Sequence, residues 1–157
     1  MLEEWLVDGY NVLRDGSLQN RRANLSRETL FDWLVSFASC GERAVLMVLD
    51  GHGKNEEFQS YKTKSFRVIY SKKVTADSLI EKMLYEKKGL SSFIVVTRDR
   101  ALSQMARGLS ARVMEPAEFI GIVKASVKEN DPVLFKEKVR SHGFSRPFEN
   151  KLNYPIE

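Results

Sequence analysis

Four aspartates occupy positions from which they could act on a common substrate. Asp8, Asp50 and Asp99 each end an apolar, strand-like run, and Asp77 lies in the first turn of a predicted helix. Two carboxylates about 4 Å apart repel each other by roughly 4 kcal/mol at an effective dielectric near 20. A cluster of such groups therefore retains protons or binds a cation.

The chemistry that such a cluster would support is phosphodiester hydrolysis. Carboxylate oxygens without His or Cys ligands favour Mg²⁺ or Mn²⁺ over zinc. A divalent ion held in this way activates water and neutralises the charge that develops on a phosphate. Each aspartate alone also fits a structural role, because Asp in a turn or in a first helical turn is favourable in itself. The functional interpretation thus requires that the four side chains meet.

Three further polar residues could support this site. Asn11 could orient a metal-bound water or touch a phosphate, or simply form a turn. Thr97 precedes Asp99 by two residues and should share its strand face, although threonine is also common in strands. Glu81 lies one helical turn after Asp77, where it is either an extra ligand or a solvated side chain.

The elements that must position these residues alternate between strand and helix. Strands are predicted over 4–9, 44–50, 66–71, 92–99 and 111–116, and helices over about 27–39, 75–89, 100–108, 116–127 and 132–142. This alternation predicts an α/β fold with a mostly parallel central sheet flanked by helices. Ligands of such folds bind beyond the carboxyl ends of the strands, so the aspartates should converge there.

Basic residues lie in the segments next to this edge, with Tyr61 and Tyr70 among them. Such a mixture can hold a phosphate backbone and stack unpaired bases, although most charged segments are simply solvated. The predicted RNA-binding residues are Arg14, Arg21, Arg22, Lys54, Lys62, Lys64, Lys72, Lys73, Arg98 and Arg100.

Composition narrows the class of protein. The chain has 157 residues, 43% of them hydrophobic, and a net charge of +4, which fits one globular domain and permits an acidic partner. The single cysteine, Cys40, excludes an internal disulfide, and we expect a reducing, cytoplasmic location without a disulfide-linked partner. No apolar run approaches the roughly 20 residues of a membrane span, so we expect neither a membrane partner nor a signal peptide.

Four motifs link these observations to a known family. The segments LVDGYN, VLDGH, TADSLIEKM and VVTRD occur in this order over roughly residues 4 to 120. Together they resemble the YacP-type NYN domains, a branch of the PIN-like nuclease superfamily. The segments VDGYN and TAD are the most specific. The resemblance implies a three-layer PIN-like (NYN) fold and a metal-dependent endoribonuclease that cuts single-stranded RNA.

The resemblance also implies roles for individual residues. Asp8, Asp77 and Asp99 would be catalytic, and the same three with Asp50 would bind one or two Mg²⁺ or Mn²⁺ ions. Some YacP-type proteins associate with the ribosome and cut messenger RNA, which makes the ribosome a candidate partner. Arg98 departs from the family, which more often has a small residue there, and this change bears on RNA contact rather than on the metals.

Two alternatives and a domain boundary complete the expectations. A non-catalytic RNA- or ribosome-binding module would keep the fold without the activity. A receiver-like domain ranks lower, because it needs a paired acidic cluster at the first strand and a lysine after the fifth. We expect the nuclease domain to span 1–143 and an irregular C-terminal extension to span 144–157.

Overall fold

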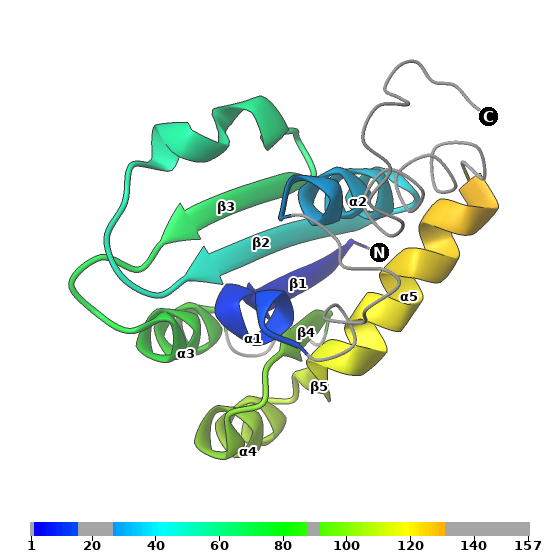
Figure 1. The fold of residues 1–157 in the computed structure, drawn as a ribbon. Helices are drawn as coiled ribbons and strands as arrows, with labels where there is room; N and C mark the ends of the chain where they lie inside the picture. Colours follow the sequence, from blue (N-terminus) through cyan, green and yellow to red (C-terminus); the bar gives the residue numbers. More distant parts are fainter. Residues whose placement is uncertain (1, 16–26, 88–91, 131–157) are drawn as a thin grey trace.

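One parallel sheet of five strands organises the molecule (Figure 1). The computed structural model describes residues 2–15, 27–87 and 92–130. The strand order is β3-β2-β1-β4-β5, and every pairing between neighbours is parallel. The strands are β1 (Glu3–Asp8), β2 (Arg43–Leu49), β3 (Phe66–Tyr70), β4 (Phe93–Val96) and β5 (Arg112–Met114). The predicted α/β fold with a parallel sheet is confirmed.

Helices cover both faces of the sheet and complete three layers (Figure 1). The helices α1, α2 and α5 lie on one face, and α3 and α4 lie on the other. Their bounds are α1 (Gly9–Leu13), α2 (Arg27–Ser39), α3 (Ala76–Glu86), α4 (Arg100–Gly108) and α5 (Pro116–Asn130), with a 3₁₀ helix η2 (Asn55–Tyr61) before β3. In the described ranges, no helix is long and apolar enough to cross a membrane.

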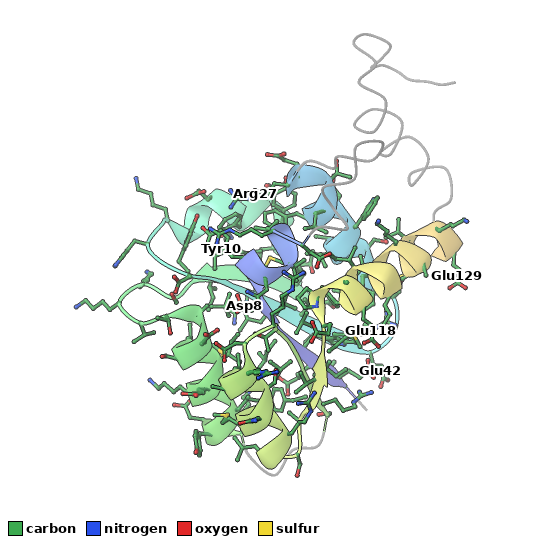
Figure 2. The ribbon with its side chains drawn as sticks, turned by 60° about the horizontal axis from the view of Figure 1, so that its bottom comes forward. Asp8, Tyr10, Arg27, Glu42, Glu118 and Glu129 are labelled. Atoms are coloured by element: carbon green, nitrogen blue, oxygen red, sulfur yellow. The ribbon has the colours of Figure 1, made fainter. Side chains whose placement is uncertain are left out.

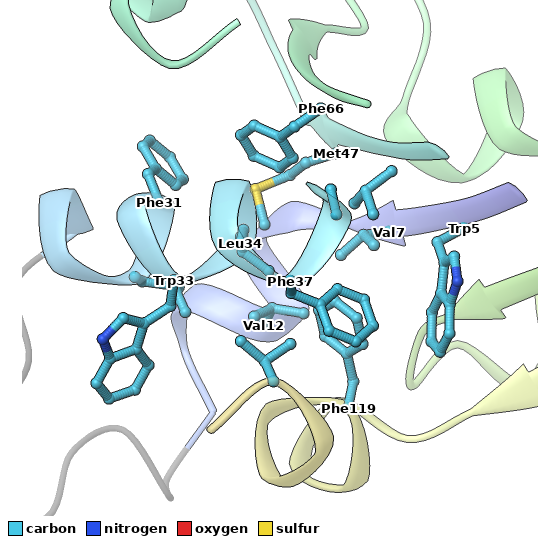
Figure 3. Packing of buried hydrophobic residues seen from close by; sticks show 14 of the residues in the cluster. Trp5, Val7, Val12, Phe31, Trp33, Leu34, Phe37, Met47, Phe66 and Phe119 are labelled. Carbon is cyan, nitrogen blue, oxygen red and sulfur yellow. The ribbon is translucent and has the colours of Figure 1, made fainter. Parts of the chain in front are cut away.

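The larger core lies between the sheet and the helices α1, α2 and α5 (Figure 3). The ring of Trp5 on β1 packs edge-on against Phe37 of α2, with ring centres 5.3 Å apart. Phe37 in turn packs against Phe119 of α5 at 5.8 Å. Four apolar residues that share one face of α2 by their helical spacing are all buried: Leu30, Trp33, Leu34 and Phe37.

A second core joins the opposite face of the sheet to α3 and α4. Leu6 of β1 packs here, whereas its neighbour Val7 faces the larger core. Both are buried, as expected for a strand covered on two faces. On α3, Ile80 and Leu84 are fully buried. The fold therefore holds β1 rigidly, and β1 carries Asp8 at its end.

The segment after β1 is a helix, so Asn11 does not form the turn that the sequence left open for it. Gly9 begins α1 directly after Asp8. A side chain at Gly9 would place its Cβ 2.4 Å from Leu49 Cδ2 and 3.0 Å from the carbonyl oxygen of Val48. Gly9 is therefore needed so that α1 can approach β2, and its backbone does not adopt the positive φ of a tight turn.

The connection between β2 and β3 contains a 3₁₀ helix that the sequence did not predict. This helix buries Phe58, whose ring packs edge-on against Phe31 at 5.6 Å. The helix predicted over 132–142, the C-terminal extension and the boundary at residue 143 lie outside the described residues.

Candidate active site

The candidate site lies where the order of the strands reverses. The chain passes from β1 to β2 and β3 on one side, and then returns to β4 on the other side of β1. The crevice at such a switch point is the usual ligand site of an open parallel sheet. Asp8 ends β1 at this point, directly before α1, which carries Tyr10 (Figure 2). Thr97 and Asp99 follow the neighbouring strand β4.

Asp8 is the most deeply buried of the four aspartates, and only 6% of the residue is exposed to solvent. Burial raises its pKa, and the nearby charge of Asp50 raises the pKa further. Interactions with Asp77, with the backbone N–H of Asn11 and with the Thr97 hydroxyl oppose this rise. Asp8 thus retains a proton more readily than an ordinary aspartate.

Asp77 stands between two other carboxylates. Its pKa is raised to about 7, first by burial, then by its hydrogen bond and charge interaction with Asp8, and then by Asp99. Asp8 and Asp99 are thus both neighbours of Asp77, although 91 residues separate them in the chain (99 − 8). We call the four interacting acids the carboxylate row, in the order Asp50, Asp8, Asp77 and Asp99.

The two outer members of the carboxylate row also accept hydrogen bonds from the first turns of helices. The Oδ1 atom of Asp50 accepts a hydrogen bond from the backbone N–H of Ala76 at 2.9 Å, at the start of α3. The Oδ1 atom of Asp99 accepts one from the backbone N–H of Leu102 at 2.7 Å, as the N-cap of α4. Asp50 and Asp99 therefore have the structural role that the sequence left open, because each stabilises the start of a helix. The same bonds hold both residues close to Asp8 and Asp77.

Asn11 and Thr97 hold the loop after β4 against α1. The Oδ1 atom of Asn11 accepts hydrogen bonds from the Thr97 hydroxyl at 3.3 Å and from the backbone N–H of Arg98 at 2.5 Å. Thr97 Oγ1 lies 3.5 Å from Asp8 Oδ2 and accepts a hydrogen bond from the backbone N–H of Asp99 at 3.0 Å. These two residues position the acids on either side of them.

Asp15 is a part of this network that the sequence did not indicate. It is only 2% exposed, and its Oδ1 atom forms an ion pair with the guanidinium of Arg98. In the sequence, RDG at 14–16 reads as an ordinary turn, and no local signal marks Asp15 as buried. The ion pair ties Arg98 to the end of α1, which differs from its predicted role in RNA binding.

A cleft of about 500 Å³ opens beside the carboxylate row. Its lining residues come from β1, α1, the loop after β2 and the start of α3: Asp8, Tyr10, Asn11, Arg14, Asp50, Thr75, Ala76 and Asp77. Asp99 and Glu81 are not among them. The cleft therefore exposes three of the four acids to a ligand, and Glu81 has no position there that supports a ligand role.

The predicted RNA-binding residues fall into separate groups. Arg14 lines the cleft. Lys72 and Lys73 follow β3, Lys54 follows the turn after β2, and Arg100 begins α4, so these four lie towards the same edge of the sheet.

Two other lysines lie elsewhere. Lys62 and Lys64 directly precede β3 and lie towards the amino ends of the strands, where Lys64 lines a separate hollow with Glu4. They are therefore remote from the carboxylate row, contrary to their predicted position. Arg21 and Arg22 lie outside the described residues.

The donor atoms of the site suit a hard divalent cation. All four acids offer oxygen, and the pKa values of Asp8 and Asp77 are raised, first by burial and then by neighbouring carboxylates: Asp50 for Asp8, and Asp8 and Asp99 for Asp77. In the described ranges, no group of three Asp, Glu, His or Cys side chains is already arranged to hold a metal ion. The chemistry of the donor oxygens therefore fits Mg²⁺ or Mn²⁺, without a preformed site among the described residues.

Comparison with known proteins agrees with this geometry. The family model of the YacP-like NYN domain matches residues 5–154. A crystal structure of Rae1 (YacP) from Bacillus subtilis is similar, with 24% identity and a TM-score of 0.66 over 89% of this chain and 84% of that one. The crystal structure of its W164L mutant is also similar, with 22% identity and a TM-score of 0.61 over 90% of this chain and 93% of that one. No match was found among curated proteins. The chain belongs to the YacP-like NYN domain family, within the PIN-like nuclease superfamily.

Proposed function

We propose that the protein is a metal-dependent endoribonuclease that hydrolyses phosphodiester bonds in single-stranded RNA. The observation that supports this function is the carboxylate row at the switch point of the sheet, in which Asp77 has its pKa raised to about 7 by burial, Asp8 and Asp99. Strongly perturbed carboxylates in a cleft are typical of functional sites. Membership in a nuclease superfamily points to the same chemistry.

In this proposal Asp8, Asp77 and Asp99 hold Mg²⁺ or Mn²⁺, and Asp50 either joins them or keeps α3 in place. When bound, such an ion supplies an activated water and neutralises charge on the phosphate. The chain itself fixes the acids: Asp8 on the buried strand β1, Asp77 on the first turn of α3, and Asp99 on the loop held by Thr97.

The test uses a circular single-stranded RNA, because only an endonuclease can open it. Purified protein is incubated with Mg²⁺, with Mn²⁺ or with a chelator. We expect cleavage with a metal ion, none with the chelator, and none by the Asp8→Asn variant. Glu3→Gln, on the opposite end of the same strand, is the matched control and should cleave like the wild type. Equal cleavage by Asp8→Asn would rule out the assigned site.

The ribosome is the candidate location of the substrate, on the basis of the family resemblance, and cleavage of messenger RNA in the cytoplasm is the corresponding role. Co-sedimentation of the purified protein with ribosomes tests this partner directly. Protein that stays in the supernatant with intact ribosomes would exclude a stable complex, while leaving the cleavage of free RNA unaffected.

A non-catalytic RNA- or ribosome-binding module is the second candidate. The hydrogen bonds from Asp50 and Asp99 to the starts of α3 and α4 favour this candidate, because they give both acids a structural role that needs no metal ion. RNA binding without cleavage in either metal would support this function.

A further inference from the structure

We propose that Arg14, held against the ring of Tyr10, binds a phosphate of the RNA strand in the cleft, so that α1 forms the substrate-binding wall of the site. The RNA is identified by the proposed function, whereas the phosphate contact follows from the charges and contacts of the cleft itself.

The charge of the cleft is the first reason. Of its described lining residues, Asp8, Asp50 and Asp77 carry carboxylates, and Arg14 is the cation. A nucleic acid carries one negative charge per phosphate, and Lys or Arg contacts supply most of its binding free energy. A strand that enters a cleft lined with acids therefore needs this guanidinium.

The geometry of Arg14 is the second reason. Its Cζ atom lies 4.7 Å from the centre of the Tyr10 ring, within the range of a cation–π contact. Tyr10 is half-buried, and its ring packs against the larger core, so it offers a fixed surface. The backbone N–H of Arg14 donates to the carbonyl oxygen of Tyr10 at 3.0 Å, which fixes the residue at the end of α1. In the described ranges, no acidic side chain forms an ion pair with Arg14.

The other wall of the cleft has fewer groups to offer. The backbone N–H of Ala76, at the start of α3, already donates to Asp50. The backbone N–H of Ser78 donates to the side chain of Thr75 at 3.1 Å. These amides would otherwise be natural donors to a phosphate. Two of the first amides of α3 are therefore already used, whereas Arg14 brings a full positive charge on the α1 side of the cleft.

Arg98 shows the contrasting arrangement. Its guanidinium is paired with the buried Asp15, and its backbone N–H is bonded to Asn11. Arg98 is therefore a positioning residue, while Arg14 presents its charge to the cleft.

The test measures binding of a short fluorescent single-stranded RNA by anisotropy, in EDTA and over a range of salt concentrations. We expect Arg14→Ala to weaken binding about tenfold, the change expected for one charge-assisted contact. It should also reduce the slope of log K against log salt by about 0.7, the contribution of one phosphate on a single strand. A purely structural role would leave this slope unchanged.

Three further variants sharpen the result. Tyr10→Leu removes the ring and should show part of the Arg14→Ala defect, whereas Tyr10→Phe keeps the ring and should lose less affinity than Tyr10→Leu. Arg107→Ala removes an exposed guanidinium from the last turn of α4, far from the cleft, and serves as the matched control. A single-stranded DNA of the same sequence should show the same loss of slope with Arg14→Ala, because the phosphate is common to both.

The outcomes separate this inference from the proposed function. If Arg14→Ala matches Arg107→Ala in affinity and slope, the inference is wrong, even if the wild type cleaves RNA. If the wild type binds RNA through Arg14 but cleaves none with Mg²⁺ or Mn²⁺, the inference stands and the endonuclease proposal fails. Absence of RNA binding by the wild type would overturn the inference.

Discussion

At the amino edge of the sheet, Glu3 and Glu4 lie beside basic side chains, whereas at the carboxyl edge the acids of the carboxylate row lie beside one another. Glu3 contacts Arg112 at 3.2 Å, and Glu4 contacts Lys87 at 3.5 Å. On the same strand, only a few residues further on, Asp8 has the carboxylates of the carboxylate row as its neighbours. The same β1 therefore begins among paired charges and ends among crowded like charges.

The two edges differ in what surrounds their acidic side chains. The amino-edge pairs are partly exposed, so each contributes little to stability. At the carboxyl edge, burial and like charge raise the pKa of Asp77 to about 7, which opposes ionisation in the folded state. Perturbed carboxylates of this kind are typical of functional sites, which is why the proposed metal site is placed at the carboxyl edge.

The largest effect should come from the centre of the carboxylate row. We expect Asp77→Asn to lower the rate of RNA cleavage at least about 100-fold, because a catalytic metal ion supplies several kcal/mol of transition-state stabilisation. Glu4→Gln at the amino edge should leave the rate within about twofold. Comparable losses in both variants would erase the distinction between the two edges.

The next effect concerns the packing that shapes the carboxyl edge. Gly9→Ala should lower the free energy of unfolding by roughly 1–3 kcal/mol, because its Cβ would lie 2.4 Å from Leu49 Cδ2. Denaturant unfolding measures the change. Gly121→Ala is the matched control, since nothing lies within 4 Å of its Cβ and alanine favours a helix. An equal loss in the control would contradict a specific role for Gly9.

The raised pKa of Asp77 should also make the stability of the metal-free protein depend on pH. Folded Asp77 keeps its proton up to about pH 7, whereas an unfolded aspartate releases it near pH 3.9. Between these values the folded state binds more protons, so this contribution to stability is full at low pH and is lost as pH rises through about 7.

Denaturant unfolding in EDTA across this pH range measures the dependence of stability on pH. Asp77→Asn should flatten it, while Glu3→Gln should leave it unchanged. A wild-type profile that Asp77→Asn does not alter would show that Asp77 is an ordinary carboxylate. The buried Asp8, whose pKa is raised in the same direction, should add to the wild-type slope.

The smallest effect belongs to the amino edge. Arg112→Ala should lower the free energy of unfolding by no more than about 1 kcal/mol, because its ion pair with Glu3 is exposed to solvent. Raising the salt concentration should reduce even that difference. A larger loss would mean that the amino-edge ion pairs make a substantial contribution to the free energy of unfolding.

The sequence predicted the fold and the meeting of the acids because both depend on local patterns. Continuous apolar runs marked the parallel strands, and Asp8 and Asp99 stood at their ends. The helix predicted to start at residue 75 does start there, with Thr75 as the N-cap whose side chain accepts a hydrogen bond from the backbone N–H of Ser78. Because ligands of parallel sheets bind beyond the carboxyl ends of the strands, these positions were enough to predict that the acids lie close together.

What the sequence did not predict depends on contacts between distant residues. The helix α1 contains Gly9, Tyr10 and Asn11, which locally favour a turn, and it is stabilised by packing on the sheet. Arg98 was expected to touch RNA, yet its partner Asp15 lies 83 residues away in the chain. No local pattern encodes such a pair, so only the folded structure assigns it.

The position of β1 in the middle of the sheet has a consequence for hydrogen exchange. The strand is paired with β2 on one side and β4 on the other, and helices cover both faces, so its amides should exchange only when the whole domain opens. Asp8 therefore cannot relieve its crowding by local fraying. Any cation that settles beside Asp8 should slow exchange throughout the sheet, and not only at the site.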